Sequence, residues 1–365
     1  MNPKPNIVDL PVYKPGKPIE EVKMELGLDD VIKLASNENP YGSSPKTKAA
    51  IMAELDNLSL YPDGSAADLT TALAEHLGVR NEQIIFGCGS DEIIALIARA
   101  FFLPGDETIM ADQTFSVYKS NADIENAVTV EVPLVSGTHD LDGMLAQIND
   151  RTKVIWVCNP NNPTGTIVSH DALTTFLKAV PSKVMVVLDE AYAEYVTDLS
   201  YTDGIKLLET YPNLVVLRTF SKIYGLAALR IGYGVGSPEV IKLINQVREP
   251  FNTSRLAQAA ALAALHDQEY VQECRRLNSA GIIQLMGEFQ RLGLKAYPAH
   301  GNFIMVDVRK PAVDVFDSLL RKGIIVRAGH RLYPSCIRVT VGSIEQNQAF
   351  ITALEQVLSE QGVNA

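Results

Sequence analysis

The stretch Thr219-Phe220-Ser221-Lys222-Ile223-Tyr224-Gly225-Leu226-Ala227-Ala228-Leu229-Arg230 follows the apolar run Leu214-Val215-Val216-Leu217. Such a run is typical of a buried β-strand, so Lys222 lies just past a predicted strand end. A lysine amine can form a Schiff base with an aldehyde, whereas hydroxyl groups and a guanidinium suit a phosphate. A lone lysine at a strand end is more often a solvated surface residue, so the rest of the chain has to decide.

The composition indicates a globular protein of two domains without nucleic-acid or membrane partners. At 365 residues the chain exceeds one ordinary hydrophobic core. Hydrophobic residues make up 47% and charged residues 21%, and no apolar run reaches the roughly 18 residues of a membrane helix. The formal net charge is −11, and no block of Lys or Arg could follow a nucleic-acid backbone. Because the first five residues lack the apolar core of a secretory signal, we expect a cytoplasmic protein.

Cysteine and histidine spacing supports neither a disulfide framework nor a metal site. The six histidines show no H-E-x-x-H or comparable spacing, so we expect no bound metal. The four cysteines form no C-x-x-C pair, which favours reduced thiols in a core: Cys88, Cys158, Cys274 and Cys336.

From residue 83 onward, short apolar runs alternate with amphipathic stretches. Strand–helix–strand units of about thirty residues imply a mainly parallel sheet with right-handed crossovers. The spacing of the last three strands agrees with this arrangement. We predict helices over Asp91–Phe102 and Ser169–Ala179, and strands over Gln83–Phe86, Glu107–Met110, Lys153–Cys158, Val184–Leu188, Leu214–Arg218 and Arg230–Val235.

The C-terminal part reads as a smaller α+β unit after a strongly helical connector at 238–292. The expected fold is therefore α/β, with a large domain (46–275) whose sheet is sandwiched by helices and a small C-terminal domain (276–365). An N-terminal arm (1–45) would join the small domain or lie across the cleft. We predict small-domain strands over Phe303–Val308, Gly323–Val326 and Ile337–Val341, and helices over 311–322 and 343–360.

Polar side chains directly follow four of the predicted strands. In open parallel sheets, ligands bind beyond the carboxyl ends of the strands, so these groups should converge on one edge. Small, amide, acidic and basic groups together match the needs of pyridoxal phosphate. The four segments are Gly87-Cys88-Gly89-Ser90, Asn159–Gly165, Asp189–Tyr192 and Thr219–Lys222.

Two of these segments suggest how the cofactor would be held. Gly89 and Ser90 immediately precede the predicted helix that begins at Asp91. Backbone N–H groups exposed there favour a phosphate, although the Asp91 carboxylate should turn away from it. Asp189 emerges from a buried strand and needs a partner, which a protonated pyridine nitrogen would supply. Taken singly, Ser90 and Asp91 could equally form a plain helix cap, and Asp189 is more often a cap or salt-bridge residue.

Three further side chains could contact the cofactor ring. Tyr192 and Asn162 could hydrogen-bond its phenolic oxygen, and Phe115 could stack on the pyridine. Taken singly, Asn162 is more often a turn residue, and an aromatic in the place of Phe115 is more often part of the core.

Motifs between residues 35 and 342 together resemble fold-type I aminotransferases, most closely the histidinol-phosphate aminotransferase family. They span nearly the whole chain and are highly specific as a set, although Asn-Pro-Thr-Gly or Ser-Lys alone would be weak. The matching pieces are Ala35-Ser36-Asn37-Glu38-Asn39-Pro40-Tyr41-Gly42, Tyr61-Pro62-Asp63-Gly64, Asn159–Gly165, Asp189-Glu190-Ala191-Tyr192, Ser221-Lys222 with Arg230, and Ile337-Arg338-Val339-Thr340-Val341-Gly342.

The resemblance implies that Lys222 holds pyridoxal phosphate in a Schiff base and that Asp189 pairs with the pyridine nitrogen. These two residues and Tyr192 are the implied catalytic residues. Tyr61 in such enzymes reaches the phosphate of the neighbouring subunit's cofactor, which implies an obligate homodimer with shared active sites. Phe115 departs from many members, which have tyrosine there; stacking survives this change but a hydroxyl contact does not. The phosphate would be held by Gly89, Ser90, Thr219, Ser221 and Arg230.

The resemblance also implies the substrate and its contacts. In the wider family the arginine at position 338 grips an α-carboxylate, which histidinol phosphate lacks. Arg338, Arg327 and Tyr13 are therefore expected to face the substrate phosphate, with Asn37 also in the substrate site. Taken singly, Tyr13, Arg327 and Arg338 are more often surface groups. The implied reaction is a ping-pong transamination in histidine biosynthesis, with 2-oxoglutarate as amino acceptor and imidazole acetol phosphate and glutamate as products.

Two kinds of alternative stay open at this point. Aromatic amino-acid aminotransferases and threonine-phosphate decarboxylases share the same scaffold, and only the substrate pocket separates them. A cofactor-free binding protein of doubly wound fold is a more distant alternative, which predicts a colourless preparation.

Overall fold

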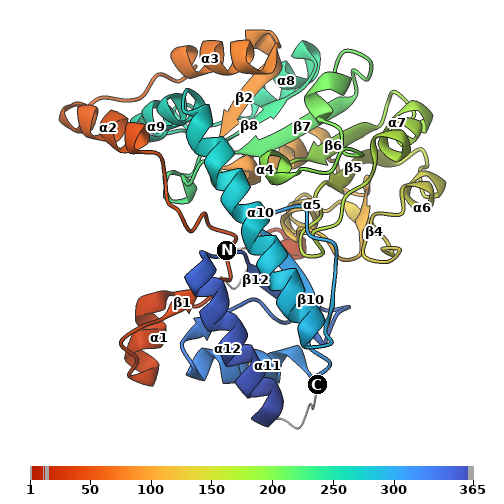
Figure 1. The fold of residues 1–365 in the computed structure, drawn as a ribbon. Helices are drawn as coiled ribbons and strands as arrows, with labels where there is room; N and C mark the ends of the chain where they lie inside the picture. Colours follow the sequence, from red (N-terminus) through yellow and green to blue (C-terminus); the bar gives the residue numbers. More distant parts are fainter. Residues whose placement is uncertain (1, 11, 13–15, 361–365) are drawn as a thin grey trace.

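A seven-stranded sheet forms the centre of the larger of two domains (Figure 1). The computed structural model describes residues 2–10, 12 and 16–360. All strands predicted for this domain form, with ends shifted by one or two residues. In spatial order the sheet contains β2 (Ile84–Gly87), β8 (Gly232–Val235), β7 (Leu214–Thr219), β6 (Met185–Asp189), β5 (Thr152–Cys158), β3 (Glu107–Ala111) and β4 (Val128–Val132).

Strand β8 runs opposite to the direction expected from strand spacing. It pairs antiparallel with both β2 and β7, whereas the other neighbouring strands pair parallel. Between β7 and β8 the chain forms only the Lys222 turn and the short helix η6 (Ala227–Leu229), so no packed helix carries it back across the sheet. The prediction that the last three strands are all parallel was wrong, but the sheet is mainly parallel as expected. Because β2 and β7 both oppose β8, the carboxyl ends of β2, β5, β6 and β7 still meet at one edge.

Helices cover both faces of this sheet, which confirms the expected three-layer arrangement. One face carries α4 (Ser90–Phe101), α5 (Val117–Ile124) and α8 (Pro238–Gln246), and the other carries α3 (Ala67–Leu77), α6 (Leu141–Ala146), α7 (His170–Ala179) and α9 (Arg255–Leu265). Central strands are buried on both faces and therefore read as continuous apolar runs. Strand β4 lies at the edge, is mostly exposed or half-buried, and is absent from the predicted strands.

The small domain is built on a three-stranded antiparallel sheet in the order β12-β10-β9. The N-terminal arm joins this domain, because β1 (Ile32–Lys33) pairs with β11 (Ile324–Ile325) and Val22 of α1 (Ile19–Leu26) packs there. The remaining elements are β9 (Lys295–Ala296), β10 (Phe303–Asp307), β12 (Cys336–Thr340), α11 (Ala312–Arg321) and α12 (Ile344–Glu360).

The long helix α10 (Gln268–Arg291) connects the two domains (Figure 1). Val271 and Cys274 near its start belong to the large-domain core, whereas Leu285 and Phe289 belong to the small-domain core. The predicted boundary between residues 275 and 276 therefore falls inside this helix and stays a prediction. Helix α2 (Pro45–Ala53) packs on α9 of the large domain. Within residues 2–10, 12 and 16–360, no helix combines the length and the apolar composition needed to cross a membrane.

Candidate active site

A cavity of about 400 Å³ opens at the carboxyl edge of the central sheet. This volume lies within the range of roughly 300–1,000 Å³ that is common for small-molecule sites. Tyr13 lies outside the described residues, and Tyr61 lies outside the cavity. The cavity brings together all the other predicted site residues: Asn37, Gly89, Ser90, Asp91, Phe115, Asn162, Asp189, Tyr192, Thr219, Ser221, Lys222, Arg230, Arg327 and Arg338.

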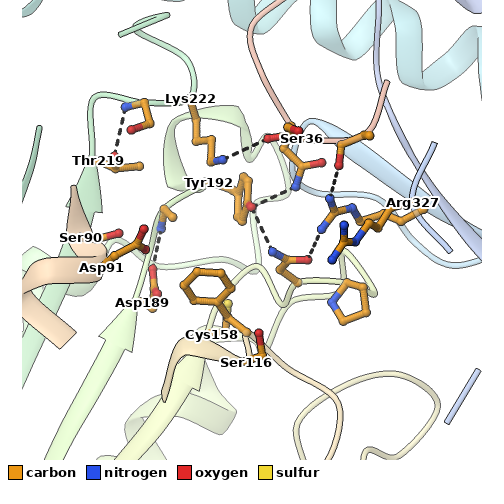
Figure 2. Close-up of a pocket in the computed structure, with 18 of the residues that line it drawn as sticks. Ser36, Ser90, Asp91, Ser116, Cys158, Asp189, Tyr192, Thr219, Lys222 and Arg327 are labelled. Atoms are coloured by element: carbon orange, nitrogen blue, oxygen red, sulfur yellow. Dashed lines mark hydrogen bonds between the residues drawn. The ribbon is translucent and has the colours of Figure 1, made fainter. Parts of the chain in front are cut away.

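Lys222 lies in the turn after β7 and extends its amine toward Ser36 (Figure 2). Its Nζ donates to the Ser36 carbonyl oxygen at 3.4 Å and lies 5.7 Å from the centroid of the Tyr192 ring. Burial, and then the positive charge of Arg338, lower the pKa of Lys222 to about 8. The amine is therefore closer to its neutral, nucleophilic form at physiological pH than the amine of an exposed lysine.

The N-terminal loop at 36–42 holds the turn that carries Lys222. Asn39 Nδ2 donates to the Ile223 carbonyl oxygen at 2.8 Å. Gly225 has a φ of 70°, and a Cβ atom at this position would lie 2.0 Å from the Gly42 carbonyl oxygen. Only glycine fits this close approach, which presses the lysine turn against the loop.

Asp189 ends β6 and is only 3% exposed. Its Oδ2 accepts a hydrogen bond from the Tyr118 hydroxyl at 2.6 Å, and its Oδ1 accepts one from the Ala191 backbone N–H at 3.1 Å. Burial raises the pKa of Asp189 to about 6, and the two hydrogen bonds oppose this rise. Since neither partner carries a positive charge, the buried carboxylate favours a cationic ligand such as a protonated pyridine.

The first turn of α4 and the Arg230 guanidinium form an anion-binding corner. Gly89 has a φ of 77°, and a Cβ atom there would lie 2.6 Å from Arg230 Nη2. Arg230 donates to Ser221 Oγ and to Asp91 Oδ2, each at 3.3 Å, so the Asp91 carboxylate pairs with the guanidinium. The Ser221 backbone N–H donates to Thr219 Oγ1 at 3.0 Å. Hydroxyl groups, a helix N-terminus and a guanidinium together suit a phosphate.

A hydrogen-bond network crosses the cavity from Tyr192 to Arg338 (Figure 2). The Tyr192 hydroxyl accepts from Asn37 Nδ2 at 3.0 Å and from Asn162 Nδ2 at 3.3 Å. Asn162 Oδ1 in turn accepts from Arg338 Nη1 at 2.6 Å. The network therefore links a large-domain tyrosine, the turn after β5, the N-terminal arm and the small domain.

The small-domain wall of the cavity carries the positive charge of two arginines. Arg338 is 8% exposed, donates to the Ala35 carbonyl oxygen at 2.6 Å, and places its guanidinium 5.4 Å from the centroid of the Phe303 ring. Arg327 exchanges two backbone hydrogen bonds with Arg338, at 3.0 and 2.7 Å, so both side chains lie on the same wall. Paired guanidinium groups favour an anionic substrate.

Two residues that shape the site are missing from the sequence predictions. His330 lines the small-domain wall, its buried Nε2 has no hydrogen-bond partner among the described residues, and burial followed by Arg338 and Arg327 lowers its pKa to about 3. Tyr118, which holds Asp189, lies three residues after Phe115 at the start of α5. That helical spacing was the available signal for Tyr118, whereas His330 lies in an irregular loop that offered none.

Tyr61 lies on the surface, 77% exposed, and stacks on Phe251 with ring centroids 4.7 Å apart. It therefore does not contribute to the cavity of its own chain. Other large apolar side chains of the same region are also exposed: Met52, Leu55, Leu58 and Leu60.

Comparisons with known proteins found relatives along nearly the whole chain. The model of the family described as "Aminotransferase class I and II" matches residues 29–354. Histidinol-phosphate aminotransferase of Brevibacillus brevis is 55% identical over 98% of this chain and 99% of its own, and that of Geobacillus sp. (strain WCH70) is 53% identical over 99% of each. The crystal structure of histidinol-phosphate aminotransferase from Sinorhizobium meliloti in complex with pyridoxal-5'-phosphate superposes with a TM-score of 0.91 at 29% identity, covering 98% of both chains. The chain therefore belongs to the class I and II aminotransferase family and, within it, to the histidinol-phosphate aminotransferases.

Proposed function

We propose that this chain is a pyridoxal-phosphate-dependent transaminase that converts histidinol phosphate and 2-oxoglutarate to imidazole acetol phosphate and glutamate. The observation that carries the proposal is the shared cavity, in which Lys222 and Asp189 lie opposite the guanidinium groups of Arg338 and Arg327. The names of the relatives support the same reaction. As an enzyme of amino-acid biosynthesis, the protein would act in the cytoplasm.

The residues of the large-domain wall fit pyridoxal phosphate. When bound, this cofactor supplies an aldehyde and an electron-accepting ring. Lys222 would carry the cofactor through its amine, and Asp189 would pair with the ring nitrogen. Tyr192 and Asn162 would hydrogen-bond the phenolic oxygen, and Phe115 would stack on the ring. The phosphate would lie against Gly89, Ser90, Thr219, Ser221 and Arg230, with Asp91 orienting the guanidinium.

Lys222 would be suited to move a proton at the substrate Cα. In the ligand-free protein the pKa of Lys222 is about 8, so its amine is deprotonated more readily at physiological pH than that of an ordinary lysine. A neutral amine can accept the proton from the substrate Cα and return it to a neighbouring carbon. Tyr192, below the amine, keeps its hydroxyl protonated because burial raises its pKa.

The small-domain wall would recognise the substrate phosphate. Arg338 and Arg327 present two guanidinium groups, and Asn37 helps to set the position of this wall through its contacts with Tyr192 and Thr340. A doubly charged phosphate gains more from two arginines than a single carboxylate does. The resemblance also implies a contact of Tyr13 with the substrate phosphate, but Tyr13 lies outside the described residues.

A homodimer would complete each site. The exposed apolar side chains around Tyr61 form a surface of the kind that mediates association. We propose that this surface meets a second copy of the chain and that Tyr61 there reaches the cofactor phosphate of its partner. Sedimentation equilibrium of the wild type and of Tyr61→Ala would test this; a monomeric wild type would refute it.

Parallel assays of the purified, cofactor-loaded protein test the proposed function. We expect transamination of histidinol phosphate with 2-oxoglutarate at a kcat/KM at least tenfold above that for phenylalanine, and no release of CO2 from threonine phosphate. A preference for phenylalanine would indicate an aromatic aminotransferase, and CO2 release would indicate a decarboxylase. A colourless protein that takes up no pyridoxal phosphate would contradict every enzymatic alternative.

A further inference from the structure

Tyr118 is fully buried beneath the cavity floor, and its hydroxyl contacts the carboxylate of Asp189. Its side chain is 0% exposed, and its hydroxyl donates to Asp189 Oδ2 at 2.6 Å. This distance is at the short end for an O–H···O hydrogen bond and is typical of a charged acceptor. The other Asp189 oxygen accepts from the Ala191 N–H, so the carboxylate is held at both oxygens.

The Tyr118 ring is fixed independently of this hydrogen bond. It stacks on Trp156 of β5, with centroids 4.9 Å apart and planes inclined by 10°. Trp156 Nε1 donates to Thr108 Oγ1 of β3 at 2.8 Å, which anchors the indole. Phe115 also packs edge-to-face against the tyrosine ring, with ring centroids 5.6 Å apart. The hydroxyl therefore arrives at Asp189 from a rigid, buried support in the helix layer.

The Tyr118 hydroxyl affects the pKa of the Asp189 carboxyl. Burial alone raises the pKa of the carboxyl, and hydrogen-bond donation by Tyr118 is the largest effect that opposes the rise. The tyrosine stays a donor because burial, followed by the charge of Asp189, raises its own pKa well above the ordinary value. A carboxylate that loses this donor would be harder to ionise and freer to rotate.

We propose that Tyr118 is a positioning residue that keeps Asp189 ionised and oriented toward the ring nitrogen of the bound cofactor. The inference rests on the proposed function, in which Asp189 pairs with that nitrogen. Tyr118 does not line the cavity, so it would act only through the Asp189 carboxylate. Its ring fills space between Trp156 and Phe115, and phenylalanine would fill the same space.

The substitution Tyr118→Phe separates the hydroxyl from the ring. In the holoenzyme we expect kcat for histidinol phosphate to fall about 10- to 100-fold while KM changes less than threefold. In the cofactor-free protein, titration with pyridoxal phosphate should show an affinity about tenfold weaker, a readout independent of turnover. Tyr233→Phe is the matched control, because Tyr233 is as buried but lies on the opposite face of the sheet and contacts Arg218.

A double-mutant cycle with Asp189→Asn shows whether the effect passes through the carboxylate. We expect Tyr118→Phe to change cofactor affinity less than twofold in the Asp189→Asn background. An equal loss in both backgrounds would overturn the proposal, because the hydroxyl would then act through packing. Unchanged affinity and kcat in Tyr118→Phe would overturn it as well. If the wild type itself takes up no pyridoxal phosphate, the proposed function fails and this inference fails with it.

Discussion

The two walls of the cavity are built in different ways. On the large-domain wall, Asp189 is the last residue of the buried strand β6, and Lys222 lies in the turn after the buried strand β7. Sheet pairing fixes where those strands end. On the small-domain wall, Arg338 depends on contacts with residues about 300 positions away. It donates to the Ala35 carbonyl oxygen, and Thr340 on the same strand hydrogen-bonds Asn37 twice.

This difference separates the chemistry from the choice of substrate. The large-domain wall is part of a rigid parallel sheet, where a small shift of Asp189 or Lys222 would disturb the reacting groups. The small-domain wall is assembled from the arm and the C-terminal domain (Figure 1), so it can differ between family members without disturbing the sheet. Substitutions on the first wall should lower kcat, whereas those on the second should raise KM.

The largest effect is expected at Lys222. Lys222→Ala removes both the amine that carries the cofactor and the proton acceptor, so kcat should fall by on the order of 10⁴-fold or more. Stopped assays at high enzyme concentration would measure it, with Lys242→Ala of the exposed face of α8 as control. A variant that kept a tenth of wild-type kcat would remove Lys222 from the mechanism.

The second-largest loss of activity is expected for Asp189→Asn. The amide cannot stabilise a positive charge on the cofactor ring, so kcat should fall on the order of 10²- to 10³-fold, with a smaller change in KM. Steady-state kinetics with histidinol phosphate would measure both parameters. A rise in KM with unchanged kcat would place Asp189 on the substrate side and contradict the division between the walls.

The same substitution should stabilise the cofactor-free protein at neutral pH. The pKa of Asp189 is about 6 in the folded state against 3.8 ordinarily, so ionisation costs stability as pH rises from about 4 to 6. Above pH 6 the cost is constant, on the order of 3 kcal/mol, and Asp189→Asn removes it. Urea unfolding should show a more stable variant at pH 7.5 and no difference at pH 3.5. A variant less stable at pH 7.5 would contradict this account of the buried charge.

On the other wall, Arg338→Lys should act mainly on substrate binding. Lysine cannot reproduce the donors to Asn162 and Ala35 or the fork that faces an anion. A loss of about 1.5–3 kcal/mol of substrate-binding free energy corresponds to a rise in the KM for histidinol phosphate of about 10- to 100-fold. Arg321→Lys on the exposed face of α11 is the control. A drop in kcat with unchanged KM would show that Arg338 serves the chemistry instead.

The smallest effect is expected where the arm meets the small domain. Thr340→Val leaves the buried Asn37 N–H without its acceptor, which should destabilise the protein by about 1–3 kcal/mol. KM should rise a few-fold because Asn37 also hydrogen-bonds Tyr192. Thermal unfolding and kinetics would measure both, with Thr352→Val on the exposed face of α12 as control. Equal effects at both threonines would mean that the contact with the arm is unimportant.

The sequence predicted the large-domain wall better than the small-domain wall for a physical reason. A buried parallel strand is a continuous apolar run, so its end, and a polar residue such as Asp189 beyond it, can be located locally. The direction of β8 could not be predicted from a local pattern, because it depends on whether a packed helix connects β7 to β8. Strand β4 was missed because an edge strand is only partly apolar.

Other parts of the site depend on contacts that no local pattern encodes. The resemblance supplied Arg327, and the structure places it beside Arg338 through backbone pairing. His330 lies in an irregular loop that only tertiary packing brings to the cavity. The spacing from Phe115 could have drawn attention to Tyr118, but only the packed structure shows that its hydroxyl reaches Asp189. The predicted role of Tyr61 is a contact with the cofactor phosphate of a second chain, and it stays a prediction.

The central claim is that Lys222 carries the cofactor. Borohydride reduction of the protein loaded with pyridoxal phosphate, followed by proteolysis and mass spectrometry, tests it most directly. We predict that the phosphopyridoxyl mass appears on the peptide that contains Lys222 and that Lys222→Ala shows no such adduct. Stoichiometric labelling of any other lysine, with Lys222 unmodified, would contradict the account.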